Sequence, residues 1–126
     1  RRLDLPVKPG VTVADWDFEA PHHGLALTPD GRTLCLAGRA SDYAALVRAP
    51  ELTLIATIPV GDAPGWAETA DKGRVCLVAN TRSDDLSIIS IPERNEIVRL
   101  PIGKGPKHIT VARLPASVVA AFKAKQ

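Results

Sequence analysis

Short runs of alternating apolar and polar residues recur along the chain, and turn-forming residues separate them. Alternation with a period of two places successive side chains on opposite faces, which is typical of β-strands. After the first run comes a Pro-Asp-Gly turn at 29–31, where proline presets φ and glycine permits positive φ. The pattern predicts two sets of four strands, at 24–28, 33–38, 44–48 and 52–58, and at 65–69, 74–80, 86–91 and 96–102.

The two sets of strands are copies of one unit. Residues 24–60 align with residues 65–102, and this alignment places Cys35 on Cys76 at a spacing of 41 residues. A repeat of about 40–45 residues built from four short strands marks a β-propeller blade. We therefore predict an all-β fold made of propeller blades, each a four-stranded antiparallel sheet.

The repeats resemble the YVTN-type repeat of bacterial seven-bladed propellers over roughly residues 21–115. The motifs that carry this resemblance are Leu-Thr-Pro-Asp-Gly at 27–31, Ala-Thr-Ile-Pro-Val-Gly at 56–61, Val-Ala-Asn at 78–80 and Leu-Ser-Ile-Ile at 86–89. The chain departs from the family pattern at Gly38, which aligns with Asn80, and at Glu68, which stands in mid-strand. The resemblance implies a propeller and a periplasmic or extracellular location. It implies no particular activity, because propellers host many unrelated functions.

Two blades do not make a closed propeller. The chain has 126 residues and a net charge of +2, whereas propellers close with about 4–8 blades. We therefore expect the C-terminal part of a larger propeller, with the other blades coming from the same precursor, a second chain or copies of this chain. The absence of Met fits a cleaved or truncated piece.

The predicted organisation places blades at about 21–63 and 64–105, between partial blades that complete a region spanning 1–115. Residues 1–7 resemble the outer strand 96–102, and 108–113 would supply only the inner strand of a third blade. In the tail 116–126, apolar residues at helix-compatible spacing indicate a short helix.

The two cysteines alternate with apolar neighbours like buried strand residues. Equivalent strands of adjacent blades hold such positions too far apart for a disulfide, which needs Cα atoms within about 7 Å. We therefore expect Cys35 and Cys76 to be buried free thiols that pack as small apolar side chains. The redox compartment stays open.

The strand order places the interblade linkers and the loops between second and third strands at one end of the blades, which we call the upper face. One linker is unusual, because it spans 14 residues between the strand-end apolar residue and the next proline, where the other two span 4. The extra residues, about ten, lie within residues 9–19 and form what we call the inserted loop. It contains Asp15, Trp16, Asp17 and Phe18. Insertions in repeat proteins often build the binding face.

Two adjacent histidines follow the inserted loop. His22 and His23 are candidate metal ligands with Asp15 or Asp17, since imidazole and carboxylate groups hold divalent metals. The favoured interpretation is structural, with a histidine at this place bonding the backbone between blades. Adjacent residues on a strand also point to opposite faces, which disfavours one shared ion.

Other polar and aromatic residues complete the candidate set. Trp66 aligns with Leu25 of the first blade, and we expect it to pack between blades. We also expect Ser41-Asp42 and Ser83-Asp84 to make local turn hydrogen bonds. The full set of ligand-binding candidates is Asp15, Trp16, Asp17, Phe18, His22, His23, Arg39, Trp66, Glu68, Arg82, Lys107 and His108.

We predict a non-enzymatic scaffold that presents loops around the central channel to a protein or small ligand, without a cofactor. One alternative is a propeller oxidoreductase or electron-transfer subunit with a metal or haem-type cofactor over the channel. A second is binding of single-stranded nucleic acid, which the near-neutral charge disfavours. The sequence contains no Walker, C-x-x-C-H or G-x-S-x-G motif, so the enzyme question stays open.

Overall fold

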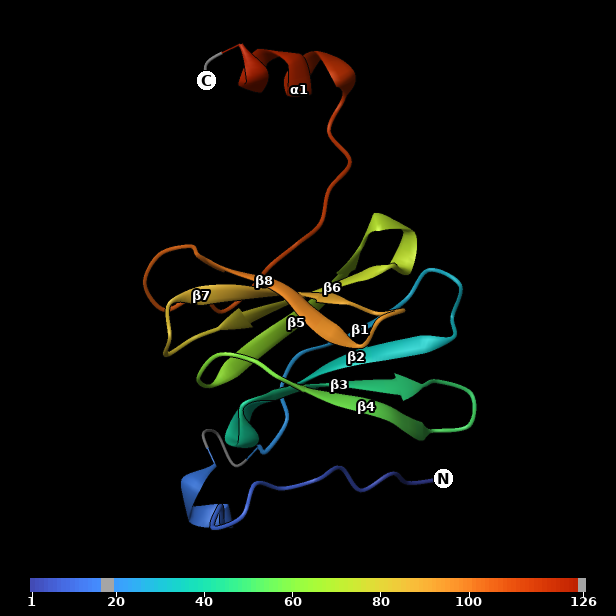
Figure 1. Cartoon of the computed structure of the whole chain (residues 1–126), viewed down its shortest axis with the longest axis vertical. Helices are drawn as coiled ribbons and strands as arrows, with labels where there is room; N and C mark the ends of the chain where they lie inside the picture. Colours follow the sequence, from blue (N-terminus) through green and yellow to red (C-terminus); the bar gives the residue numbers. More distant parts are fainter. Residues whose placement is uncertain (17–19, 125–126) are drawn as a thin grey trace.

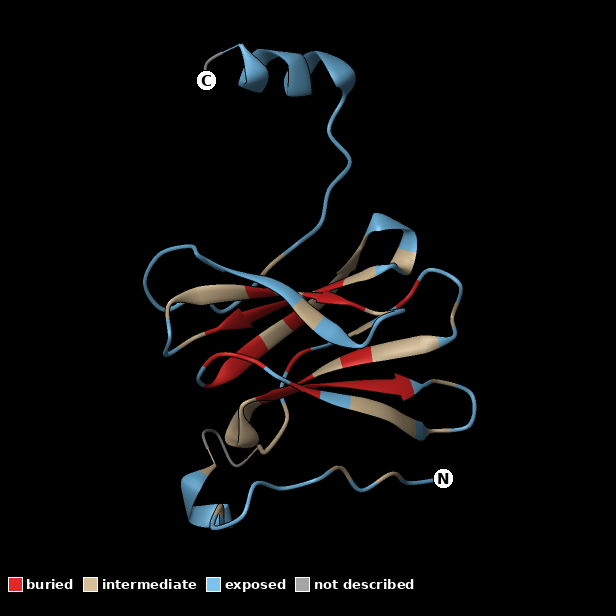
Figure 2. Cartoon of the chain, viewed as in Figure 1, coloured by how far each residue is buried: buried red, intermediate tan, exposed pale blue. Residues whose placement is uncertain are grey.

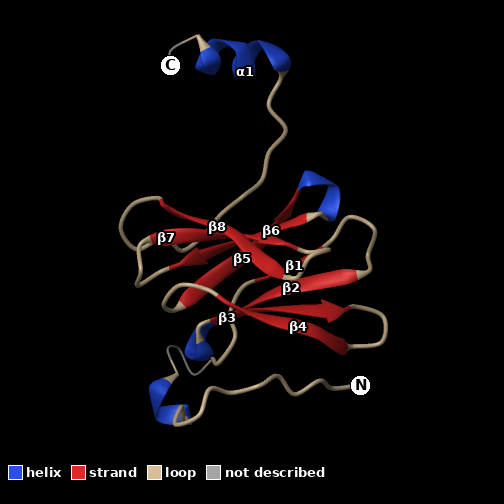
Figure 3. Cartoon of the chain, viewed as in Figure 1, coloured by secondary structure: helices blue, strands red, loops and turns tan. Residues whose placement is uncertain are grey.

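The computed structural model describes residues 1–16 and 20–124 and contains two four-stranded antiparallel sheets (Figures 1 and 3). The first sheet, blade 1, has the order β1-β2-β3-β4, and the second, blade 2, has the order β5-β6-β7-β8. The strands are β1 (Leu25–Leu27), β2 (Thr33–Gly38), β3 (Tyr43–Arg48), β4 (Thr53–Pro59), β5 (Pro64–Ala70), β6 (Val75–Asn80), β7 (Asp85–Ser90) and β8 (Asn95–Pro101). The helical segments are η1 (Val13–Asp15), η3 (Arg39–Ser41), η4 (Asp71–Gly73) and α1 (Ala116–Lys123).

The all-β fold predicted from alternation is confirmed, and each observed strand overlaps a predicted one. Within a blade, consecutive strands pair through short turns, so the strands lie in sequence order. A four-stranded sheet exposes two faces, and each blade must cover its faces with a neighbour. Blade 1 and blade 2 do this by stacking on each other, as the burial pattern in Figure 2 shows.

The strand registers correct the alignment of the two repeats by one residue. Leu27 pairs with Leu34 in blade 1, and Thr69 pairs with Cys76 in blade 2, so these equivalent positions differ by 42 residues. Cys76 is therefore the counterpart of Leu34, not of Cys35. A one-residue slip moves every side chain of a strand to the other face of its sheet.

This slip explains why the prediction of free thiols was wrong. Cys35 points from blade 1 toward blade 2, and Cys76 points from blade 2 toward blade 1. They form a disulfide with a Cα–Cα distance of 6.5 Å, and both are fully buried. Around it lies the core between the blades, which includes Leu46, Ile58 and Ile89.

Hydrogen bonds between loops fix the upper face. Asp42 and Asp84 both have positive φ, and each accepts a bond from the linker that leaves its blade, at the N–H of Ala63 and of Gly105 respectively. Ser83 Oγ accepts the N–H of Asp62, from the linker that enters blade 2. The expectation of local turn bonds at these Ser-Asp pairs was therefore wrong, since these partners lie 21 residues away.

The two ends of the chain lie outside the sheets. Residues 1–8 are extended along blade 1 without strand pairing. Residues 108–113, expected to supply the inner strand of a third blade, form no strand. A linker separates α1 from the sheets, and the described residues of α1 are exposed (Figures 1 and 2). Within the described ranges, no helix is long and apolar enough to cross a membrane.

Candidate functional site

A hollow of about 210 Å³ opens on the upper face beside the inner strand of blade 2. We call it the Gly65 hollow. It brings together four of the ligand-binding candidates with two residues that were not among them. Its lining residues are His23, Arg39, Gly65, Thr81, Lys107 and His108. The described lining thus carries two imidazoles and two basic side chains but no carboxylate.

At the Gly65 hollow, blade 2 has small residues where blade 1 has large ones. With the 42-residue shift, Gly65 is the counterpart of His23 and Thr81 is the counterpart of Arg39. A Cβ atom at Gly65 would lie 2.8 Å from Thr81 Oγ1 and 3.2 Å from Arg39 NH1. The absence of a side chain at Gly65 therefore lets Thr81 and Arg39 approach the inner strand of blade 2, and even one methyl group would displace them.

Aromatic rings form the inner wall beside the hollow. The Trp66 ring stacks at a tilt on the ring of His108, with centroids 4.4 Å apart, and its other neighbour is His23 at 6.0 Å. His23 Nδ1 donates to the carbonyl of Gly65 at 2.8 Å, since a carbonyl can only accept. This bond fixes the imidazole against the neighbouring blade, as the structural interpretation of His23 expected.

The position of Trp66 differs from that given by the sequence alignment. Its counterpart in blade 1 is Gly24, not Leu25, because of the 42-residue shift. A Cβ atom at Gly24 would lie 2.5 Å from the Trp66 Cα, so the two inner strands meet here backbone to backbone. Trp66 is half-buried at this seam between the blades.

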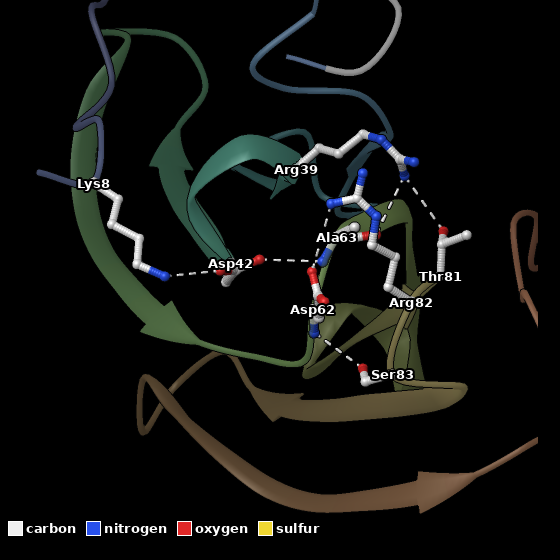
Figure 4. Close-up of polar contacts among 8 residues, drawn as sticks. All are labelled: Lys8, Arg39, Asp42, Asp62, Ala63, Thr81, Arg82 and Ser83. Carbon is white, nitrogen blue, oxygen red and sulfur yellow. Dashed lines mark hydrogen bonds and ion pairs between the residues drawn. The ribbon is translucent and has the colours of Figure 1, made fainter. Parts of the chain in front are cut away.

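Arg39 bridges the two blades at the rim of the hollow. Its guanidinium donates to the carbonyl of Ala63 at 3.3 Å and to Thr81 Oγ1 at 3.4 Å (Figure 4). Thr81 Oγ1 in turn donates to the carbonyl of Pro106 at 3.0 Å, which fixes the linker that carries Lys107 and His108. These bonds hold the basic and aromatic groups of the hollow on a common frame.

A second, more polar hollow is lined by residues 8–11 and by Asp15, and it shares Arg39 with the first. It contains the candidates Asp15 and Arg82, beside two ion pairs, Lys8–Asp42 at 3.1 Å and Arg82–Asp62 at 4.0 Å (Figure 4). Thr12 donates two hydrogen bonds to Asp15, from its backbone N–H and its hydroxyl, and they lower the pKa of that carboxyl. Charges of both signs alternate here, as on a solvated rim.

His22 does not join His23 in a common site. Its Nε2 lies 2.7 Å from the hydroxyl of Tyr43, which donates its own proton to the carbonyl of Pro6. His22 must therefore donate from Nε2, so its neutral form carries the proton there. Burial lowers the pKa of His22 and raises that of Tyr43.

The remaining candidates lie apart from the hollow or outside the described part of the chain. Glu68 accepts the N–H of Thr69 through Oε1. Trp16 is half-buried at the end of η1, whereas Asp17 and Phe18 are outside the described residues. In residues 1–16 and 20–124, no three His, Cys, Asp or Glu side chains gather as a group that could hold a metal ion.

The comparisons with known proteins support the fold. No protein-family model matches the chain, and no curated protein matches it. Hydrazine synthase of Kuenenia stuttgartiensis is similar with a TM-score of 0.66 and 23% identity, over 68% of this chain and 24% of that chain. Dihydro-heme d1 dehydrogenase NirN, solved in complex with DHE, is similar with a TM-score of 0.58 and 24% identity, over 68% of this chain and 19% of that chain.

These two similarities define the fold class of the chain and nothing further. Both solved structures are propeller proteins, and together with the two stacked sheets they show a partial β-propeller. The chain spans about a quarter or less of the length of each similar protein. A propeller scaffold with further parts follows from this.

Proposed function

We propose that the chain supplies two blades of a propeller scaffold that binds a small anionic group in the Gly65 hollow. The observation that carries the proposal is the lining itself, in which the basic side chains of Arg39 and Lys107 meet two imidazoles. Imidazole, guanidinium and ammonium groups all donate hydrogen bonds, and those to anions are stronger than neutral ones. An acidic substituent of a ligand is the complementary group.

The size of the hollow limits the ligand. Drug-sized ligands occupy pockets of about 300–1,000 Å³, and this hollow holds about 210 Å³. One carboxylate or phosphate group with a small ring fills it. A larger ligand would place only its acidic edge here and extend toward the channel.

The test is a titration of the purified chain with benzoate, followed by NMR, with methyl benzoate as the uncharged control. We expect benzoate to shift the resonances of Gly65 and Thr81, and Lys107→Gln to weaken binding about two- to fivefold, as for a partly exposed charge. Lys104→Gln is the matched control, because Lys104 lies in the same linker but outside the lining. Equal effects of the two substitutions, or equal binding of the methyl ester, would contradict the proposal.

A haem-type group is the second candidate ligand, because the similar NirN is a dihydro-heme d1 dehydrogenase solved in complex with DHE. The fit to the residues present is partial. Lys107 and Arg39 suit the carboxylate substituents of such a group, and His108 is an exposed imidazole beside them. When bound, the group would supply redox chemistry. The test is the visible absorbance of haemin after incubation with the native chain or with His108→Ala. If neither chain changes the spectrum of free haemin, this candidate is removed.

The disulfide supports a location outside the reducing cytosol, because buried disulfides are rare where thiols are kept reduced. We propose a periplasmic or extracellular setting on this ground. It agrees with the location implied by the repeat resemblance.

A further inference from the structure

The two end faces of the blade pair are unequal. On blade 1, the face turned away from blade 2 is buried under the chain's own N-terminal segment. Tyr43, Ala45 and Val47 form this cluster, and Leu3 and Leu5 pack against it. We call this contact the N-terminal cap.

The seam between the blades shows what the cap imitates. In that seam, Cys76, Val78 and Ile89 of blade 2 pack in the core that holds Leu46 and Ile58 of blade 1. With the 42-residue shift, the blade 1 counterparts of these three residues are Leu34, Leu36 and Val47. They form the face that the cap covers.

A hydrogen bond between a linker and a serine hydroxyl, which we call the loop clamp, occurs both at the seam and at the cap. At the seam, Asp62 donates its N–H to Ser83 Oγ at 3.0 Å. At the cap, Lys8 donates its N–H to Ser41 Oγ, also at 3.0 Å, and Ser41 is the counterpart of Ser83. Residues 3–8 therefore occupy the place that the outer strand and linker of a preceding blade would take.

In the part of the chain that the structure describes, the far face of blade 2 has no such cover. The counterparts of the seam residues Ala56, Ile58 and Val60 are Val98, Leu100 and Ile102, which are 40%, 42% and 45% exposed. Asp84 already holds the N–H of Gly105, as Asp42 holds that of Ala63. The exposed Lys104 is the counterpart of Asp62, and its N–H is the position at which a neighbouring blade would offer a hydroxyl.

We propose that the open face of blade 2 accepts a further blade of the same repeat but of different sequence, and that the N-terminal cap excludes a second copy of this chain. The accepted blade presents an apolar face and a serine or threonine hydroxyl to Lys104 N–H. Blade 1 of a second copy has this chemistry, but residues 3–8 already cover it. Continuity with the established seam carries the inference, and it is independent of the ligand in the Gly65 hollow.

The experiment separates the two faces by substitution and measures assembly by native mass spectrometry. Leu3→Asp/Leu5→Asp removes the cap, and adding Leu100→Asp to it blocks the open face. We expect the triple variant alone and the native chain alone to form no head-to-tail pair. Mixed together, they should form a complex of one copy each, because one supplies the open blade 2 and the other an uncapped blade 1.

The control replaces an exposed apolar residue outside residues 3–8, as Val13→Asp with Leu100→Asp. This variant keeps the cap and should not pair with the native chain. Circular dichroism and the intact disulfide verify folding. If the triple variant does not fold, Ser41→Ala combined with Leu100→Asp loosens only the clamp and should give a weaker complex. No complex from folded variants, or rings of the native chain that Leu100→Asp breaks, would overturn the proposal.

Discussion

Blade 1 and blade 2 share one frame and differ at its upper end. Both blades have the same strand order, and their equivalent positions differ by 42 residues. In both, an aspartate accepts a hydrogen bond from the linker that leaves the blade, Asp42 from Ala63 and Asp84 from Gly105. The differences gather around the second strand and the entrance to the first. The exchanged pairs are His23 and Gly65, Gly24 and Trp66, Gly38 and Asn80, Arg39 and Thr81, and Tyr43 and Asp85.

Several of these exchanges compensate one another in volume. In blade 1, a Cβ atom at Gly38 would lie 2.6 Å from the Tyr43 ring, so the glycine makes room for the tyrosine. In blade 2, Asn80 fills the same place and donates to Asp85 at 2.6 Å. At Gly65 and Thr81, two small residues of blade 2 stand at the positions of His23 and Arg39 in blade 1, and the hollow opens beside them. The hollow thus lies at one of the places where blade 2 carries smaller residues than blade 1.

The largest expected effect comes from cutting the covalent link between the blades. Cys35→Ala/Cys76→Ala should lower the free energy of unfolding by about 3–4 kcal/mol, because the disulfide closes a loop with a sequence separation of 41 residues. Urea denaturation with and without reductant measures this. Reductant should destabilise the native chain and leave the double variant unchanged. A reductant effect of equal size on both would mean that the disulfide does not stabilise the seam.

Glycines on the two inner strands should respond differently to a methyl group. Gly24→Ala should lower the free energy of unfolding by about 1–3 kcal/mol, since its Cβ would meet backbone atoms of Trp66 and Ala67 at 2.5 and 2.8 Å. Gly65→Ala crowds the ends of the Thr81 and Arg39 side chains, which can move, and meets backbone, the Lys107 carbonyl, only at an ordinary contact distance of 3.8 Å. It should cost less stability and still weaken benzoate binding.

Thermal unfolding and the NMR titration together test this contrast. Gly31→Ala is a control for stability alone, because its positive φ of 71° is strained in alanine while no atom lies near the new Cβ. Equal destabilisation at Gly24 and Gly65 would show that the hollow is not the looser of the two places.

The sequence predicted the strands well because their alternation is local. Turn residues and a period of two determine where strands begin, and the structure moves each boundary only slightly. The pairing of Cys35 with Cys76 could not be predicted in the same way, because it depends on which face each strand shows. A single residue of slip in the alignment reversed that face for the second cysteine.

The candidate site shows a similar division. His23, Arg39, Lys107 and His108 were found because charged and aromatic side chains stand out in a sequence. Gly65 and Thr81 were missed, since they contribute by the volume they lack. The signal that could have found them is the corrected alignment, in which each is small opposite a large residue of blade 1.

The smallest expected effect is on the pH dependence of the free energy of unfolding. It arises from His22 of blade 1, whose counterpart in blade 2 is Pro64, a residue that cannot titrate. Burial lowers the pKa of His22 below its ordinary value of 6.5, so the unfolded chain binds the proton first. The contribution of His22 to stability is therefore present above pH 6.5 and is lost as the pH falls below it. His22→Gln keeps a donor toward Tyr43 but removes the titration. The free energy of unfolding should then fall less steeply between pH 7 and pH 5 than in the native chain, by under about 1 kcal/mol for this half-exposed group. Parallel urea titrations of the two chains across that range measure the difference, and identical slopes would mean that the histidine of blade 1 is no more sensitive to protons than the proline of blade 2.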